Sequence, residues 1–382
     1  MELKSHGKCL VFCALLIFMG CLTVVNASEI SDNTTNVVYD DIQSIDTQEQ
    51  YTQEIIKTED VMEKKVSKKE SSTENVKMAN QVTVNSYQQL LEEVENAKKS
   101  TQKTYTINLN PGNYDVTNQI RWDNSTGTSK KLIINGNNNV ISGKNSYTFI
   151  NVTSDNTLEL NNITLKNFKT AIYSNKGKIS LTNCTLTNNT VSLTNNTVSN
   201  GGSAIYSSYC NVSLYNSTLT NNTGKTYGGA IYSDHGNVLL YNSSLSGNTA
   251  NYEGGAIRSR VGNVSLYNST LTGNTANGGG GGAIYSSDGN VLLYNSTLMG
   301  NSGAAIYSFS GNVLLYNSTL SGNTANGGGG GAIDSYRGNV SLYNSTLSGN
   351  TANYGGGAIR SILDTVLWYN STANVLLCYQ TK

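Results

Sequence analysis

Acidic side chains are the residues of this sequence that could do acid–base or metal chemistry, and they are thinly spread. Glycoside hydrolysis needs paired carboxylates, and a Ca²⁺ site needs clustered ones. The carboxylates beyond residue 150 are Asp155, Glu159, Asp234, Glu253, Asp288, Asp334 and Asp364. Because only the first two lie close in sequence, we expect no catalytic residue and no metal site. Asp334 and Arg360 occupy equivalent positions of successive repeats and should form a structural ion pair.

Three further features invite a chemical interpretation but have simpler explanations. His235 follows Asp234 in a turn, where we expect a solvated side chain. Glycine runs begin at Asn277 and Asn326, but the Lys-Ser/Thr pair and helix of a phosphate-binding loop do not follow them, so we interpret them as variable loops. The cysteines beyond the N-terminal segment are an odd, dispersed set, unlike a disulfide framework or a metal cluster. They are Cys184, Cys210 and Cys378.

Tyrosine recurs most regularly, in two series of equivalent positions. One series follows each Ala-Ile pair and is interrupted by Arg258, Asp334 and Arg360. The second series is uninterrupted and consists of Tyr215, Tyr241, Tyr267, Tyr294, Tyr316, Tyr343 and Tyr369. Alternation along a strand places both series outside. Tyrosine stacks well between neighbouring strands, so a structural role is one explanation. The alternative is an aromatic ladder that binds sugar rings or a partner protein, and we take the second series as the candidate binding face.

Sequons of the form Asn-x-Ser/Thr recur along the chain and offer N-glycosylation sites in an exported protein. The asparagines of the repeated Tyr-Asn-Ser-Thr motif occupy a corner, and we expect their side chains to point inward, where no glycan fits. Sequons in outward turns are better candidates. We select Asn33, Asn124 and Asn221.

A repeat in the second half of the chain determines the elements that position these residues. Residues 228–250 read GGAIYSDHGNVLLYNSSLSGNTA, and near-copies precede and follow them. From Ile205 onward, the next Val always lies seven positions after the Ile of Ala-Ile, whereas successive Ala-Ile pairs lie 22 to 33 residues apart. In complete repeats, the length varies only between Ser-Thr-Leu and the next Ala-Ile. A constant segment followed by one loop of variable length is typical of repeat units that stack on one another, because a single unit cannot bury its apolar face alone.

Alternation within the rigid path predicts three short strands in each repeat, with Asn and Gly at the corners that need a left-handed backbone. The predicted fold class is all-β: a right-handed single-stranded parallel β-helix of the pectin-lyase-like type. Each rung should add one strand to each of three parallel sheets, and residues of one type should stack in columns. Stacked asparagines could hydrogen-bond along such a column. We place this domain at residues 81–382, with regular repeats from about 157 to 372.

Three kinds of sequence precede the repeats. Residues 1–28 combine a basic start, an apolar run and small residues at Ala27 and Ser28, and are interpreted as a signal peptide, or as an anchor if cleavage fails. Residues 29–80 are charged and polar, which predicts a disordered spacer. Residues of about 86–100 show helical spacing of apolar residues, and Ser86 with Gln89 fits a capping box. We expect a helix there that caps the open end of the β-helix.

The bulk composition limits the partners. Formal net charge is zero and charged residues make up 13% of the chain, so no nucleic acid partner is implied. Only the N-terminal segment, left uncleaved, would contact a membrane. No sequence pattern suggests a cofactor.

The repeat also resembles a known family. GGAIYS followed by N-S-T-L-x-x-N-T-A is similar to the repeats of polymorphic outer-membrane-type proteins. The order of signal, charged spacer, cap helix, NPGNYD and repeats resembles the archaeal adhesin-like proteins of methanogens, over about residues 80–372. This resemblance implies a right-handed β-helix at the cell surface, without specifying a ligand.

These observations predict a secreted or cell-surface, adhesin-like β-helix protein that is not an enzyme. Its partners would be surface glycans or cell-surface proteins. A polysaccharide-degrading lyase or hydrolase is the first alternative, because parallel β-helices also support such enzymes. A purely structural surface spacer is the second.

Overall fold

The computed structural model describes residues 81–123, 128–190, 201–327, 329–363 and 365–373, and the backbone of Cys378–Gln380. The expected signal peptide and spacer therefore lie outside the described residues. The candidate glycosylation sites Asn33 and Asn124 lie outside them as well.

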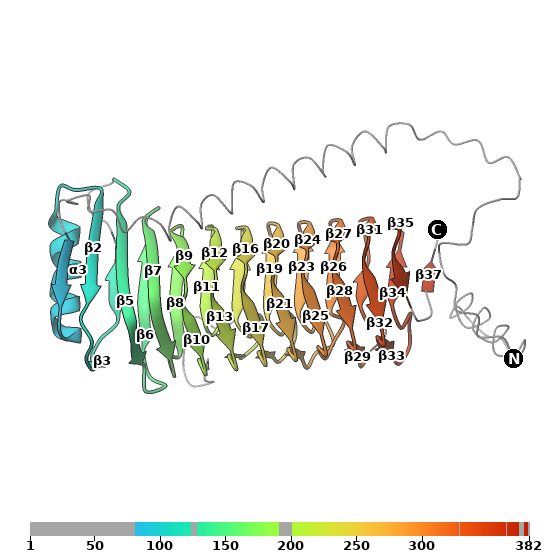
Figure 1. Cartoon of the computed structure of the whole chain (residues 1–382), viewed down its shortest axis with the longest axis horizontal. Coiled ribbons are helices and arrows are strands. Elements are labelled where there is room, and N and C mark those ends of the chain that lie inside the picture. The colour runs from blue at the N-terminus through green and yellow to red at the C-terminus, as the bar shows by residue number, and fades with distance from the viewer. Residues whose placement is uncertain are drawn as a thin grey trace, which may run out of the picture. The chain divides into compact units, whose positions relative to one another are not determined.

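Short strands stack rung upon rung in the described part of the chain (Figure 1). A representative rung comprises β15 (Ile231–Asp234), β16 (Val238–Tyr241), β17 (Ser244–Ser246) and β18 (Thr249–Ala250). The first three are the strands that the repeat predicts. The fourth was not anticipated: it is a two-residue strand at the start of the length-variable loop.

The strands that follow Ala-Ile in the repeats form one sheet of eleven strands. Its other members are β4 (Ile120–Trp122), β6 (Thr148–Thr153), β8 (Thr170–Asn175), β11 (Ile205–Ser208), β19 (Ile257–Val261), β23 (Ile284–Asp288), β26 (Ile306–Ser310), β30 (Ile333–Ser335), β34 (Ile359–Ile362) and β37 (Cys378–Gln380). Each rung therefore contributes one strand to this sheet.

The other two main strands of each rung belong to a sheet of 21 strands, because β5 (Lys131–Ser142) and β7 (Thr157–Lys166) run through the corner that separates them elsewhere. Before that corner lie β1 (Gln81–Val84), β2 (Thr104–Leu109), β9 (Lys178–Thr182), β12 (Val212–Tyr215), β20 (Val264–Tyr267), β24 (Val291–Tyr294), β27 (Val313–Tyr316), β31 (Val340–Tyr343) and β35 (Val366–Tyr369). After it lie β3 (Tyr114–Asp115), β10 (Thr185–Thr187), β13 (Thr218–Thr220), β21 (Thr270–Thr272), β25 (Thr297–Met299), β28 (Thr319–Ser321), β32 (Thr346–Ser348) and β36 (Thr372–Ala373). The remaining short strands are β14 (Thr223–Gly224), β22 (Thr275–Ala276), β29 (Thr324–Ala325) and β33 (Thr351–Ala352).

The register confirms the alignment made on the Ala-Ile pairs. Ile231 pairs with Ile205 in the rung before it and with Ile257 in the rung after it, in parallel ladders. Val238 pairs in the same way with Val212 and Val264. Equivalent residues of successive repeats are therefore direct neighbours, and the chain forms a parallel β-helix.

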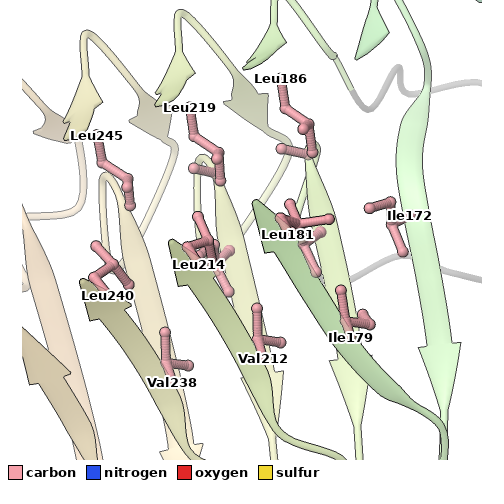
Figure 2. Packing of buried hydrophobic residues seen from close by; sticks show 14 of the residues in the cluster. Ile172, Ile179, Leu181, Leu186, Val212, Leu214, Leu219, Val238, Leu240 and Leu245 are labelled. Atoms are coloured by element: carbon pink, nitrogen blue, oxygen red, sulfur yellow. The ribbon is translucent and has the colours of Figure 1, made fainter. Parts of the chain in front are cut away.

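Columns of identical apolar residues fill the interior. Figure 2 shows Leu186, Leu219 and Leu245 in one row, beside rows of valine and leucine from neighbouring strands. These side chains are fully buried, or nearly so, because strand alternation turns every second residue inward. Apolar side chains at equivalent positions of successive rungs pack against each other, and this packing supplies most of the apolar contact that one repeat could not make alone.

A column of buried asparagines follows the second corner of each rung. Asn274 accepts hydrogen bonds from the backbone N and the Nδ2 of Asn248, at 3.0 and 2.9 Å. Its own Nδ2 donates to Oδ1 of Asn301 at 3.0 Å and to the Leu245 carbonyl at 3.0 Å. The column consists of Asn189, Asn222, Asn248, Asn274, Asn301, Asn323 and Asn350. The predicted hydrogen bonding along stacked asparagines is confirmed.

One helix packs at the first end of the stack. Helix α3 (Tyr87–Lys99) contacts β1, β2 and β4 and buries Tyr87, Leu90, Val94 and Ala97 (Figure 1). One half of the capping box is present, since the backbone N of Gln89 donates to Ser86 Oγ. The Gln89 side chain accepts from the backbone N of Asn85, one residue before the cap. Neither this helix nor any other in the described residues is long and apolar enough to cross a membrane.

Candidate binding surface

The uninterrupted tyrosine series forms a column that is stacked at its last three rings and tilted before them, and much of it is shielded from solvent. Tyr316 and Tyr343 stack with centroids 4.6 Å apart, and Tyr343 and Tyr369 with centroids 4.8 Å apart. Tyr241 and Tyr267 are each only 3% exposed. Tyr241 contacts the ring of Tyr215 at a tilt, with centroids 6.5 Å apart, and Tyr267 contacts Tyr294 at 6.1 Å. Alternation along one strand does not reveal such burial. The expectation of an openly exposed ladder is therefore wrong for the inner rungs, and Tyr369, at 45% exposed, is the most accessible ring.

Of the remaining members, Tyr316 is buried and Tyr215, Tyr294 and Tyr343 are half-buried, and none of the inner rings lacks a partner. Burial raises the pKa of Tyr215, and it raises that of Tyr343 to about 12. Tyr215, Tyr241, Tyr267, Tyr294 and Tyr316 all make further interactions. The predicted binding role of this column stays a prediction.

The interrupted series lies on the outer face of the eleven-stranded sheet. Tyr206 stacks on Tyr173 at 4.8 Å, and burial, with neighbouring negative charge, raises its pKa to about 12. Where the series is interrupted, the guanidinium of Arg258 lies 4.3 Å from the ring centre of Tyr285, and its Nε donates to Glu253 at 2.8 Å. A cation over an aromatic face continues the stack, so the interruption is a substitution of one stacking group for another.

Two of the exposed aromatic side chains, Tyr209 and Phe309, lie where strands of the eleven-stranded sheet end, and each stacks on a ring of the next rung. Tyr209, 58% exposed, stacks on His235 with centroids 4.6 Å apart. Farther along the stack, Phe309, 40% exposed, stacks on Tyr336 at 5.1 Å, and Arg337 lies over that ring at 5.2 Å. We call these five residues the aromatic corner. Sequence reasoning missed it because the aromatic residues replace non-aromatic ones at turn positions and do not recur in every repeat.

Four of the acidic side chains beyond residue 150 are engaged by basic ones. Asp334 is 3% exposed and accepts two hydrogen bonds from Arg360, Nε to Oδ1 and Nη2 to Oδ2, both at 2.7 Å. This pair confirms the predicted ion pair. Burial raises the pKa of Asp334, and the guanidinium opposes that rise. The other pairs are Glu159–Lys131 at 2.6 Å, Glu253–Arg258 at 2.8 Å and Asp234–Arg260 at 3.2 Å.

The carboxylates of these four pairs thus neutralise cations within the stack. Asp155 and Asp288 are exposed, and Asp364 lies outside the described residues. In the described ranges, no three side chains of His, Cys, Asp or Glu converge to a metal-binding group. His235, predicted to be solvated, is about one-third exposed, and its Nδ1 lies 2.9 Å from Asp234 Oδ1.

Cysteine and glycine residues have structural roles. Cys184 and Cys210 are buried thiols that form no disulfide within the described residues, and burial raises the pKa of the Cys210 thiol. At Gly254, the first glycine of one Gly-Gly-Ala-Ile segment, φ is +66°. A Cβ at the second, Gly255, would lie 2.1 Å from the carbonyl oxygen of Gly282 in the next rung. These glycines are therefore explained by the backbone conformation and by the close approach of the next rung, and a phosphate-binding role is not needed to account for them.

The Tyr-Asn-Ser-Thr asparagines face the opposite way from the expectation. Asn268 has φ +49° and an exposed side chain, whereas Ser269, directly after it, is buried and donates from Oγ to the Tyr267 carbonyl at 2.8 Å. The left-handed backbone at this corner turns the asparagine out and the serine in. Asn221, the one described member of the selected glycosylation sites, is exposed with φ +53°.

Comparison with known proteins agrees with the fold. The family model of the right handed beta helix region matches residues 188–320. The chain is a β-helix repeat protein. No curated protein and no solved structure matches it. As a β-helix repeat protein it shares an architecture with enzymes and non-enzymes alike, so its function has to be argued from its surface.

Proposed function

We propose that this β-helix repeat protein is exported and acts at the cell surface as an adhesin-like protein that binds glycans and is not an enzyme. The observation that supports this proposal best is the aromatic corner. It offers two pairs of stacked, solvent-accessible rings, from Tyr209 with His235 and from Phe309 with Tyr336. Flat aromatic faces bordered by polar groups suit the apolar faces and hydroxyl groups of sugar rings.

The charges between these pairs fit a carbohydrate partner. Arg260 and Asp288 are exposed in the two rungs between the aromatic pairs, and Arg337 flanks the second pair. Guanidinium and carboxylate groups can hydrogen-bond to sugar hydroxyls on both sides of a stacked ring. Because equivalent positions repeat at the strand spacing of about 4.8 Å, an extended polymer could lie along the corner and contact several rungs.

The direct test compares binding of full-length variants to a glycan array and to glycan-coated beads. Changing Tyr209, Phe309 and Tyr336 to serine should reduce binding at least tenfold while the circular dichroism spectrum is unchanged. A Tyr369→Ser variant, which removes the most accessible ring of the candidate column, separates the corner from the column. Undiminished glycan binding by the triple variant would refute the aromatic corner as the binding surface. Binding to purified proteins but not to glycans would refute the glycan partner and indicate a protein partner.

The enzymatic alternative is tested separately. Incubation with acidic and neutral polysaccharides, with and without Ca²⁺, should give no turnover, because the described carboxylates Glu159, Asp234, Glu253 and Asp334 pair with cations. Turnover that disappears on replacing Asp234 or Asp334 would contradict the proposal.

A further inference from the structure

One outward column of asparagines runs along the first corner, between the Val-x-Leu-Tyr strand and the strand after it. Each member has a left-handed backbone, with φ between +45° and +51°, and each is followed two residues later by serine or threonine. We call it the outer asparagine column. It consists of Asn162, Asn183, Asn216, Asn242, Asn268, Asn295, Asn317, Asn344 and Asn370.

The backbone conformation by itself does not demand asparagine. At the second corner, a left-handed residue recurs in the same way, and there the last five complete rungs use glycine: Gly247, Gly273, Gly300, Gly322 and Gly349, with φ of +61° or +62°. Space is not the reason, since a Cβ at three of these glycines would meet nothing within 4 Å. Glycine is the residue that adopts this conformation most readily, yet it never occurs in the nine rungs of the first corner.

In six of the nine rungs the asparagine side chain is not used inside the stack either, whereas Asn216 makes a further interaction. Within the described residues, Asn242, Asn268, Asn295, Asn317, Asn344 and Asn370 are exposed, and their side-chain amides make no hydrogen bond. Asn183 differs, since its Nδ2 donates to Oδ1 of Asn162 at 3.0 Å.

A second exposed asparagine column shows what structural use looks like. In it, Oδ1 of Asn237 accepts the backbone N of Asn263 at 2.8 Å, and Oδ1 of Asn263 accepts that of Asn290 at 2.9 Å. These bonds form whether or not a hydroxyl residue stands two positions later: Asn263 has Ser265 there, and Asn237 has Leu239. In that column the amide, not the sequon, explains the asparagine.

The hydroxyl residues of the outer column are accessible as well. Thr270 and Thr297 begin their strands with half-exposed side chains, and Thr346 is exposed. Threonine also follows the second corner, so a strand preference contributes to its presence. Only at the first corner does each of the nine rungs combine the hydroxyl with an asparagine.

We propose that the outer asparagine column is a set of N-glycosylation sites. The Nδ2 of an asparagine would form a bond to the anomeric carbon of an oligosaccharide carried on a lipid phosphate. The bond from that carbon to the phosphate oxygen breaks, the lipid phosphate leaves, and the amide proton passes to a base of the glycosyltransferase. Since successive sites lie about 4.8 Å apart, neighbouring glycans crowd each other, and fewer than nine sites are filled on one molecule. This inference depends on the export that the proposed function includes.

Glycopeptide mass spectrometry of the full chain, purified from the cells that produce it, tests the inference. Glycans are expected on several members of the outer column and not on Asn211, Asn263 or Asn339, whose Oδ1 atoms accept backbone hydrogen bonds. An intact mass equal to that of the bare polypeptide, or glycans confined to other sequons, would overturn it.

Two triple variants make the test specific. Ser244, Thr270 and Thr297 changed to valine keep the asparagines and a strand-forming side chain but remove the hydroxyls, so glycans should disappear from Asn242, Asn268 and Asn295. Changing those three asparagines to glycine should remove the same glycans and leave the circular dichroism spectrum unchanged. Retention of the glycans in the valine variant contradicts the proposal. If the protein is at the cell surface but carries no glycan, only the glycosylation proposal is rejected. If the protein is kept inside the cell, both the glycosylation proposal and the proposed function are rejected.

Discussion

At the scale of single residues, the direction of an asparagine side chain decides its role. The buried column that includes Asn274 provides each rung with amide hydrogen bonds to both neighbours, while Asn268, at the previous corner, faces solvent. Removing a buried partner leaves donors and acceptors without water, which costs far more than removing an exposed amide.

The first prediction follows from that contrast. Asn274→Ala should lower the free energy of unfolding by about 3 kcal/mol, because the donors of Asn248 lose their acceptor in the interior. Asn268→Gly, the matched control, should change it by about 0.5 kcal/mol or less, since glycine suits the left-handed corner. Denaturant titration of the two variants measures both values, and equal losses would contradict the assigned roles.

A second prediction concerns the buried ion pair. Arg360→Ala leaves the Asp334 carboxylate unpaired and should cost about 3–5 kcal/mol. Replacing both residues by tyrosine, as in other rungs of the same column, should recover most of that loss, because stacked rings then take the place of the two charges. Thermal unfolding of the single and double variants distinguishes the outcomes. A double variant no more stable than Arg360→Ala would show that the pair contributes something that rings do not.

Residue directions were also the least predictable part of the molecule from sequence. The alternation of Ile231, Tyr232 and Ser233 correctly indicates which side of a strand faces inward. It does not apply across a corner, where a left-handed residue reverses the pattern, so Asn268 was expected inside. Nor does it report what covers an outward ring, which is why the burial of Tyr241 and Tyr267 was not foreseen.

At the scale of elements, the constant seven-residue spacing fixed the strands, and the variable segment corresponds to the loop. The parallel pairing of β15 with β19, Ile231 against Ile257, follows directly from that spacing. The extra strand β18 was missed because two residues are too short a run to show any periodicity. The aromatic corner was missed because irregular substitutions leave no trace in a repeat consensus.

The third prediction tests this division between path and loop. Replacing residues 275–283, TANGGGGGA, by the SGAA of residues 302–305 gives that repeat the shortest natural spacing while the register is preserved. The free energy of unfolding should change by about 1 kcal/mol or less, since loop length has a weak effect on closure entropy. As a control, one alanine inserted after Arg260, inside the rigid path, should shift side chains to the wrong face and destabilise the neighbouring rungs. If both changes are equally harmful, the loop is not adjustable.

At the scale of the whole molecule, stacked rungs share half-buried tyrosines along their outer faces. Burial raises the pKa of Tyr206, Tyr285 and Tyr343 to about 12 from an ordinary value of 10.0. A raised pKa means that the folded protein holds the phenolic proton more tightly than the unfolded chain. Their contribution to stability is therefore intact below pH 10 and is lost as the pH rises toward 12.

The fourth prediction is a fall in the thermal unfolding temperature across this alkaline range, spread over many rungs because stability in stacked repeats depends on nearest neighbours. Tyrosinate absorbance and circular dichroism recorded together supply the measurement. Complete tyrosine ionisation near pH 10 with the β spectrum intact would contradict the burial of these rings.

The central claim, that the stack lies outside the cell with its long faces open to other molecules, is tested most directly by labelling intact native cells. A membrane-impermeant reagent that reacts with amines, followed by peptide mapping, should modify Lys225, which is partly exposed on the variable loop, without prior lysis. A cytoplasmic protein serves as the control for leakage. Labelling of Lys225 in intact cells is the predicted result; labelling that occurs only after lysis would contradict the account.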